Sequence, residues 1–162
     1  MKRVMFIMCA AAIALSMNAC KIKRQSSANN VVTIQEANGV YTIDLNLVEK
    51  YWKLIELNGN PIAPANESRE AHIIFHTENN RFSGSTGCNR MMGSYQTKED
   101  NQIVLSSAAT TQMMCIDSQI MEIEVGFLKA LEMTDSYSVK NDTLTLSNAN
   151  TTLARLVVVY LR

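Results

Sequence analysis

The sequence lacks the features that would place it in several common functional classes. Its 162 residues carry 15 basic and 15 acidic side chains, so no excess of positive charge is available to attract a nucleic acid. Only two histidines are present, too few for an ordinary zinc centre. No nucleophile elbow and no carboxylates at an informative spacing are found. We therefore expect a protein that is not an enzyme, holds no metal or cofactor and binds no nucleic acid.

An apolar run long enough to cross a membrane is also missing. Residues 4–15 are apolar without interruption, whereas a spanning helix needs about 20 such residues. Lys2 and Arg3 precede this run, and the small residue Ala19 follows it. This order is typical of a secretory signal peptide.

The end of the leader resembles a bacterial lipobox. Residues 15–20 read Leu-Ser-Met-Asn-Ala-Cys, and in such a motif the cysteine is diacylated and becomes the new N-terminus. We interpret residues 1–19 as a lipoprotein signal peptide and residues 20–30 as a lipidated tether that begins at Cys20. Buried acyl chains contribute about 0.8 kcal/mol per CH₂, enough to hold the domain at a membrane. Plain secretion with an unmodified Cys20 is the alternative.

Cleavage leaves two cysteines besides Cys20, and an oxidising envelope favours their pairing. Cys88 lies in a Thr-Gly-Cys-Asn motif and Cys115 ends a Thr-Thr-Gln-Met-Met-Cys segment. Their disulfide would stabilise the fold by about 3–4 kcal/mol according to the chain-entropy model. Two inert thiols, a metal site and a nucleophilic cysteine are the competing interpretations.

Short alternating segments predict a mostly β chain. Asn38-Gly39 is a strong hairpin turn signal and predicts an additional N-terminal hairpin over residues 31–46. Further strands are expected at residues 51–57, 71–77, 81–85, 93–97, 102–106, 137–140, 143–147 and 152–161. One amphipathic helix is expected over residues 117–133, because Ile120, Ile123, Phe127, Leu128 and Leu131 fall at helical spacing.

Three residue types invite a functional interpretation. Trp52, the only tryptophan, is at strand spacing beside Leu54 and reads as a core anchor. His72 and His76 would share one face of a strand about 13 Å apart, at about 3.3 Å per residue, too far for one metal ion.

Four methionines surround the two cysteines in the sequence: Met91, Met92, Met113 and Met114. Methionine fills irregular space in cores and also forms adaptable binding surfaces. Core filling, a hydrophobic surface for a ligand or partner, and Cu(I) binding are the three interpretations, in that order.

Several short motifs together resemble the META/HslJ family of heat-shock-protein-like bacterial lipoproteins. The matching residues are Trp52-Lys53-Leu54 before Asn58-Gly59, Gly87-Cys88-Asn89, Gly93, Tyr95, and Thr111 with Met114-Cys115. The resemblance covers about residues 50–161, so residues 47–162 are expected to form the family domain. Trp52, Gly87, Asn89, Gly93, Tyr95 and Thr111 are its motif residues in this chain.

The resemblance implies an α+β, mostly β fold: a small antiparallel, open or cracked β-barrel packed with one α-helix. The resemblance also implies a role in envelope stress, drug tolerance, or secretion or virulence. Such folds are similar to those of lipid-anchored secretion pilot proteins, which hold hydrophobic ligands. We expect a non-enzymatic accessory protein, lipid-anchored to a membrane of the bacterial envelope with its domain in the periplasm or at the cell surface. Its partner would be an envelope protein or a hydrophobic ligand. An envelope enzyme, with carboxylates converging from distant positions, is the alternative.

Overall fold

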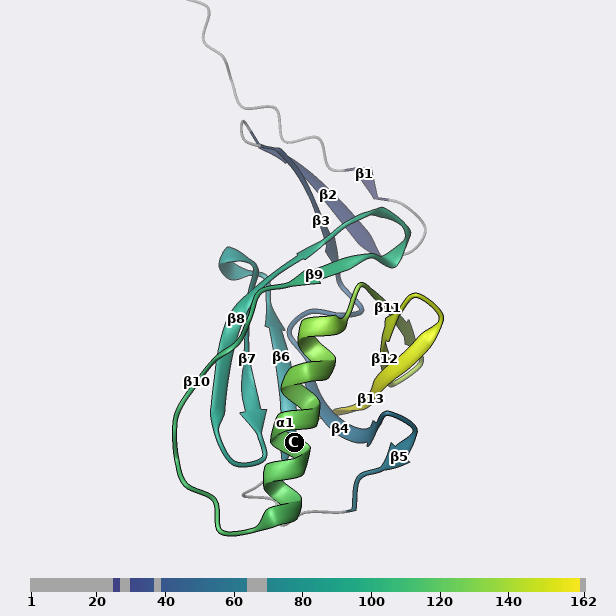
Figure 1. Ribbon diagram of the computed structural model, residues 1–162. Helices are drawn as coiled ribbons and strands as arrows, with labels where there is room; N and C mark the ends of the chain where they lie inside the picture. Colours follow the sequence, from purple (N-terminus) through teal and green to yellow (C-terminus); the bar gives the residue numbers. More distant parts are fainter. Residues whose placement is uncertain (1–24, 27–29, 37–38, 64–69, 161–162) are drawn as a thin grey trace, which may run out of the picture.

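The computed structural model describes residues 25–26, 30–36, 39–63 and 70–160 (Figure 1). The predicted signal peptide and Cys20 lie outside these residues. Within the tether predicted for residues 20–30, Gln25–Ser26 forms a two-residue strand, β1, that pairs with β2.

Antiparallel strands and one α-helix make up the described part of the chain. The strands are β1 (Gln25–Ser26), β2 (Val31–Glu36), β3 (Gly39–Asp44), β4 (Tyr51–Leu57), β5 (Asn60–Pro61), β6 (Ala71–His76), β7 (Arg81–Thr86), β8 (Arg90–Thr97), β9 (Ile103–Leu105), β10 (Ala109–Thr110), β11 (Ser136–Lys140), β12 (Thr143–Asn148) and β13 (Thr151–Val159). The α-helix is α1 (Ser118–Met133), and two short 3₁₀ turns are η2 (Glu78–Asn80) and η3 (Glu99–Asn101).

The strands form an antiparallel sheet in the order β1-β2-β3-β8-β7-β6-β4-β13-β12-β11, with β9 and β10 paired to β8 and β5 paired to β4. This sheet is not closed. One isolated bridge, between Gln102 and Ser136, links the start of β9 to the start of β11 without extending into a ladder. The prediction of a mostly β fold with one helix is confirmed.

The core lies between the helix and the sheet. Strands β6 and β7 alternate, so that Ile73, Phe75 and Phe82 are buried on one face, as the two-residue period of a strand requires. The helix contacts β4, β7, β12 and β13, and it inserts Phe127 and Leu131 into the same cluster. Figure 1 shows α1 lying across this face of the sheet.

The β4 strand departs from simple alternation. Its ladder with β13 shifts register between Arg155 and Leu156, which pair with Glu56 and Leu54. Ile55 is therefore the extra residue of a β-bulge and is exposed. As a result Leu57 is buried in place of Glu56, which instead pairs with Arg155 at 3.2 Å. The bulge therefore leaves Glu56 off the core face that Trp52 and Leu54 share.

The N-terminal hairpin is attached to the rest of the sheet through a single register pair. β2 and β3 pair along their whole length, from Val31 with Asp44 to Glu36 with Gly39. β3 meets β8 where Thr42 pairs with Thr97, and the Thr42 hydroxyl donates to the Thr97 carbonyl at 3.0 Å. In Figure 1 the hairpin projects from the end of the molecule opposite to the connection between β10 and α1.

Candidate functional site

The candidate site is built on the bend between β7 and β8. Gly87 has φ of +97°, a conformation that favours glycine. The Thr86 N–H donates to the Asn89 carbonyl at 2.8 Å, and the Asn89 N–H donates to the Thr86 hydroxyl at 2.9 Å. These reciprocal bonds fix the direction in which the side chains of Cys88 and Asn89 leave the bend.

The Asn89 side chain joins this bend to two other segments. Its Oδ1 accepts from the Met113 N–H at 2.7 Å and from the Thr111 hydroxyl at 2.8 Å. Its Nδ2 donates to both oxygens of Glu124 in α1, at 2.9 and 3.0 Å. Asn89 is buried, and a buried amide must find partners for both of its ends. We name this arrangement the Asn89 clamp.

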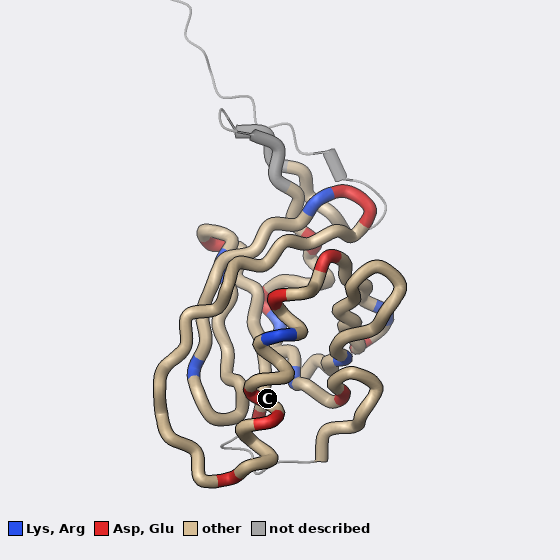
Figure 2. Tube along the Cα trace, in the orientation of Figure 1, with Lys and Arg blue, Asp and Glu red and all other residues tan. Residues whose placement is uncertain are grey.

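The two cysteines lie at disulfide distance beside the clamp. The α-carbons of Cys88 and Cys115 are 6.1 Å apart, within the range that a disulfide requires. The segment from Thr111 to Cys115 is thus positioned by the clamp near its start and by the sulfur pair at its end. Figure 2 shows that this connection carries no charged residue until Asp117.

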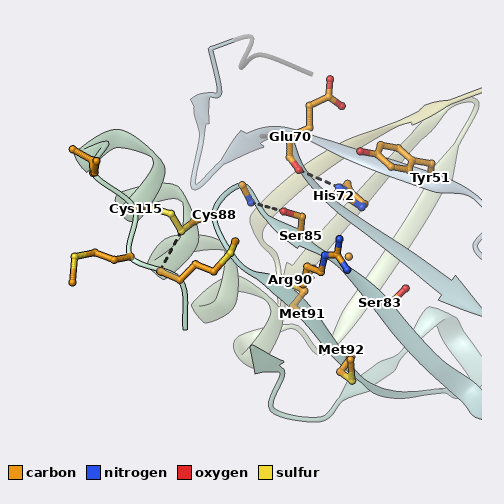
Figure 3. A pocket seen from close by; sticks show the side chains of 15 residues that line it. Tyr51, Glu70, His72, Ser83, Ser85, Cys88, Arg90, Met91, Met92 and Cys115 are labelled. Atoms are coloured by element: carbon orange, nitrogen blue, oxygen red, sulfur yellow. Dashed lines mark hydrogen bonds between the residues drawn. A yellow bond between two sulfur atoms is a disulfide. The ribbon is translucent and has the colours of Figure 1, made fainter. Parts of the chain in front are cut away.

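A groove of about 790 Å³ opens beside the cysteine pair (Figure 3). It lies along the face of β6, β7 and β8 that is turned away from the core and continues past the β7–β8 bend. Its lining comes from β4, β6, β7, β8 and the connection between β10 and α1: Tyr51, Glu70, His72, Ser83, Gly84, Ser85, Gly87, Cys88, Arg90, Met91, Met92, Met113, Met114, Cys115 and Ile116. A volume of this size is typical of small-molecule sites.

One end of the groove is polar. The rings of Tyr51 and His72 stack with centroids 4.2 Å apart, and His72 Nδ1 lies 3.0 Å from the Glu70 carbonyl. Because the carbonyl can only accept, Nδ1 carries the proton of this bond. Burial lowers the pKa of His72 below its ordinary value, so the ring is neutral near pH 7. The Glu70 carboxylate pairs with Lys53 at 2.7 Å.

The other end of the groove is apolar. Met92 is 51% exposed, Met113 58%, Met114 95% and Ile116 99%. Such clustered exposed apolar side chains are typical of binding surfaces rather than of an ordinary protein surface. Met91 is only 1% exposed and packs in the core, because it points to the opposite side of β8 from Met92. Core filling, the first interpretation of the four methionines, is therefore correct for Met91 and wrong for Met92, Met113 and Met114, to which the candidate hydrophobic surface is limited.

The predicted motif residues divide into two sets. Gly87, Asn89 and Thr111 build the bend and clamp beside the groove. The others support the core: Trp52 is buried and its Nε1 donates to the Leu47 carbonyl at 2.8 Å, and a Cβ at Gly93 would lie 2.4 Å from the Phe82 ring.

Tyr95 is also a core residue, and its hydroxyl donates to the His76 carbonyl at 3.0 Å. Burial raises the pKa of Tyr95 to about 12. The structure gives a fold-supporting contact to each of the six predicted motif positions.

The unpredicted residues of the site include Tyr51, Glu70, Arg90 and Glu124. Glu124 lies on the expected helix, yet no sequence signal connects it with Asn89, which is 35 positions earlier. Arg90 follows the recognised Gly-Cys-Asn motif directly, and that adjacency is the one signal that could have drawn attention to it.

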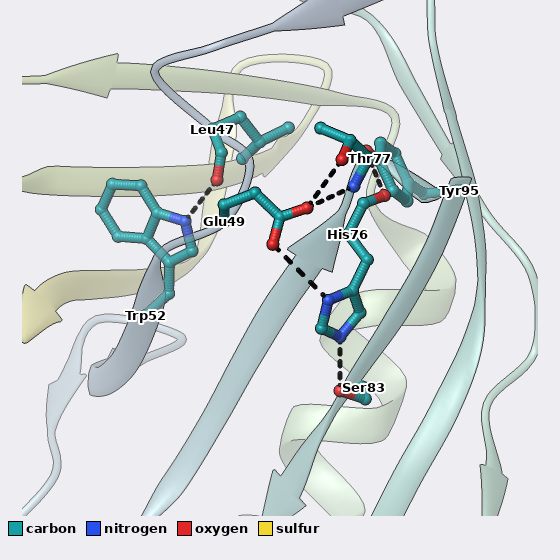
Figure 4. A network of polar contacts seen from close by, with 7 residues as sticks. All are labelled: Leu47, Glu49, Trp52, His76, Thr77, Ser83 and Tyr95. Atoms are coloured by element: carbon teal, nitrogen blue, oxygen red, sulfur yellow. Dashed lines mark hydrogen bonds and ion pairs between the residues drawn. The ribbon is translucent and has the colours of Figure 1, made fainter. Parts of the chain in front are cut away.

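The two histidines of β6 lie on one face, as predicted, and each has its own partners. His76 Nε2 lies 2.8 Å from the Ser83 hydroxyl oxygen, and its Nδ1 lies 3.8 Å from a Glu49 carboxylate oxygen (Figure 4). Thr77 donates to Glu49 through its N–H at 2.6 Å and its hydroxyl at 2.9 Å. The backbone bond from Thr77 is the main reason that the pKa of Glu49 lies below its ordinary value.

The order Ser83, His76, Glu49 is that of a nucleophile, a base and an orienting acid. However, Ser83 is inside β7, which pairs with β6 on one side and with β8 on the other. The strand N–H groups around Ser83 are therefore engaged in the sheet and do not form an oxyanion hole.

Two further features concern metal binding and membrane crossing by the described residues. No group of three or more His, Cys, Asp and Glu side chains there is arranged to hold a metal ion. The helix α1 does not have the length and apolar character needed to cross a bilayer, and neither does any other helix of that part of the chain.

Comparisons with known proteins place the chain among its relatives. Residues 45–159 match the protein family described as "META domain". No curated protein sequence matches the chain significantly.

Solved structures with a similar fold include one determined by NMR that is 26% identical, with a TM-score of 0.54 over 68% of this chain and 91% of the other. A second NMR structure, from Burkholderia xenovorans, is 23% identical, with a TM-score of 0.57 over 71% and 85% of the two chains. The match to the first of these structures extends over nearly the whole length of that protein, so the part that the two proteins share is a complete domain.

Proposed function

This protein belongs to the META domain family, and we propose that it is a lipid-anchored accessory protein of the bacterial cell envelope that binds an apolar ligand or partner segment. The proposal assigns it a binding function and no catalytic one. Lipidation at Cys20 would hold the domain at a membrane, in the periplasm or at the cell surface. The family resemblance connects such a protein with stress, drug tolerance or secretion.

The groove beside the cysteine pair is the observation that carries this proposal. Met114 and Ile116 are almost fully exposed, although Met114 belongs to the segment that the clamp and the sulfur pair hold in place and Ile116 directly follows it. Exposed apolar side chains on a fixed segment form a preorganised binding surface. A ligand that buries them does not have to offset the entropy of ordering the segment. Burial of apolar area contributes about 25 cal/mol per Å².

The position of the groove agrees with an anchored binding module. Strands β1 to β3, which follow the proposed anchor, lie at one end of the molecule, and the connection between β10 and α1 lies at the other (Figure 1). The anchored end and this connection are therefore far apart in the molecule. An apolar ligand or partner would thus reach the groove from the side away from the anchored end.

The binding proposal can be tested with N-phenyl-1-naphthylamine, a neutral apolar dye whose fluorescence rises on burial. We expect the mature domain to bind the dye and Met114→Glu to weaken that binding at least tenfold, because a charge would face the buried dye. Val104→Glu is the matched control: Val104 is about half exposed and lies on β9, outside the groove lining. Equal dye binding by wild type and Met114→Glu would reject the groove as the site.

The anchor can be tested separately in cells. Replacement of Cys20 by Ser should move the protein from the membrane fraction to the soluble fraction, because the acyl acceptor is lost. Unchanged partitioning would reject lipidation and leave the groove proposal unaffected.

An envelope enzyme remains the second candidate, favoured by the 2.8 Å contact between His76 and Ser83. A fluorophosphonate probe reacts with activated serines. If this candidate were correct, the probe would label wild type and would not label Ser83→Ala or His76→Gln. We expect no labelling of wild type above that of the Ser83→Ala variant.

A further inference from the structure

The groove has a charged residue placed between its polar and apolar ends. Arg90 is the first residue of β8, is exposed and lines the groove. Its guanidinium forms no ion pair with the described acidic residues, whereas Lys53 is neutralised by Glu70 at 2.7 Å. Among the described residues, the polar end therefore presents a positive charge without an ion pair at Arg90 and a neutral His72.

Register pairs place hydroxyl groups next to this charge. Across the sheet, Lys53 pairs with His72, His72 with Ser85, and Ser85 with Arg90. Directly opposed residues on one face of a sheet have their Cβ atoms about 5 Å apart. Ser85 Oγ accepts from the Gly87 N–H at 3.1 Å, a bond that leaves its own proton available as a donor. Figure 3 shows the Arg90 guanidinium between Ser85 and Ser83 and directed toward His72.

The apolar end begins next to the same charge. Met92 lies two residues after Arg90 on the same face of β8, and it pairs with Ser83 of β7. Met113, Met114 and Ile116 continue the apolar lining on the far side of the bend. A cation with adjacent hydroxyls, followed by a strip of exposed methionine and isoleucine, is complementary to an acid group that carries a hydrocarbon chain.

From this arrangement we propose that the groove binds a free fatty acid, with its carboxylate at Arg90 and Ser85 and its chain running past the bend along Met113 and Met114. The inference rests on the proposed binding function and names the class of its ligand. A carboxylate is planar and accepts two parallel hydrogen bonds from a guanidinium. Unbranched, polarisable methionine side chains adapt to a flexible chain.

The test compares three ligands that have the same twelve-carbon chain and different head groups. Dodecanoate, dodecanol and dodecyltrimethylammonium, each below its micellar concentration, compete with the bound naphthylamine dye on the mature wild-type domain. We expect dodecanoate to compete about tenfold more strongly than dodecanol, and the cationic ligand to compete most weakly. Equal competition by dodecanoate and dodecanol would overturn the assignment of the acid group.

Variants then assign the preference to its residues. Arg90→Gln should lower the affinity for dodecanoate about tenfold and leave that for dodecanol unchanged. Lys140→Gln is the control, because it removes one positive charge from an exposed site on β11, outside the groove. If Lys140→Gln had the same effect as Arg90→Gln, the preference would reflect net charge and the proposed contact would be wrong.

Failure of this inference can be distinguished from failure of the proposed function. Dye binding that responds to Met114→Glu but not to the ligand head group would leave an apolar binding site and reject the fatty acid. Dye binding that is indifferent to Met114→Glu would reject both. Displacement of the dye by an uncharged apolar peptide, without displacement by dodecanoate, would assign the groove to a protein partner instead.

Discussion

The two faces of β6, β7 and β8 belong to the same strands and have opposite properties. The inner face carries Ile73, Phe75 and Phe82, packed under α1 in a continuous apolar cluster. The outer face carries His72, Ser83 and Arg90 in the groove, open to solvent. Because side chains alternate along a strand, every second residue of these strands serves the fold and the residues between them are available for binding.

This comparison shows where the recognisable sequence motifs act. Trp52, Gly93 and Tyr95 belong to the core, whereas Gly87, Asn89 and Thr111 hold the bend and its neighbouring segment. The motif residues thus build the scaffold and one wall of the groove. Residues that would contact a ligand, such as Arg90 and Met114, lie beside them.

Single substitutions at two adjacent residues of β7 should show the largest difference in stability between the two faces. Phe82→Ala removes a ring that is 1% exposed and should lower the free energy of unfolding by about 3–5 kcal/mol. Ser83→Ala, one position later on the outer face, should change it by less than about 1 kcal/mol, because it loses only the hydrogen bond with His76. Urea unfolding monitored by Trp52 fluorescence measures both. Similar losses for the two variants would contradict the division into faces.

Loss of the cysteine pair should have the next-largest effect on the free energy of unfolding. Cys88→Ala together with Cys115→Ala opens a loop with a sequence separation of 27, and we expect the free energy of unfolding to fall by about 3–4 kcal/mol. The tryptophan bands in the near-ultraviolet circular dichroism of the folded variant should be unchanged, since Trp52 is buried in the core and does not line the groove beside this link. Mass analysis of unreduced mature protein should find no free thiol at either position. Free thiols at both would reject the disulfide.

The main elements could be predicted because local patterns specify them. The helix is an example: its buried positions Phe127 and Leu131 recur at helical spacing, and Asp117 Oδ1 caps it by accepting from the Gln119 N–H at 2.9 Å. The hairpin of β11 and β12 follows from its Asn141-Asp142 turn in the same way. Such signals lie within a few residues of one another.

The groove could not be predicted, because its polar end depends on register between strands. Tyr51, His72 and Arg90 come from three strands and share no local motif. Their proximity follows from the pairing of β4 with β6, of β6 with β7 and of β7 with β8, which the sequence does not state. The β-bulge at Ile55 is a second example, since it is visible only in the ladder with β13.

The Asn89 clamp should contribute less to the free energy of unfolding than the cysteine pair does. It can be broken by a nearly isosteric substitution. Asn89→Asp replaces the amide donor by a carboxylate facing Glu124, so two like charges would meet where two hydrogen bonds now form. We expect the free energy of unfolding to fall by about 2–3 kcal/mol. Adding Glu124→Gln should restore part of that loss, because the glutamine amide can donate to the new carboxylate. The absence of any recovery in the double variant would mean that the contact with Glu124 contributes little.

The smallest expected effect concerns the ionisation of a core residue. Burial raises the pKa of Tyr95 to about 12, compared with about 10 in an unfolded chain. The folded state therefore holds this proton more tightly, and its contribution to stability is complete below pH 10 and declines as the pH rises toward 12.

In a spectrophotometric titration of phenolate absorbance, Tyr95→Phe should remove one late-titrating tyrosine. It should also make unfolding less sensitive to pH above 10, with a loss of about 1 kcal/mol at neutral pH from the missing bond to the His76 carbonyl. An exposed tyrosine provides the contrast, since Tyr160→Phe, at 67% exposure, should leave neutral-pH stability unchanged. A Tyr95 that titrates near pH 10 would show that the inner face of the sheet admits water at this position.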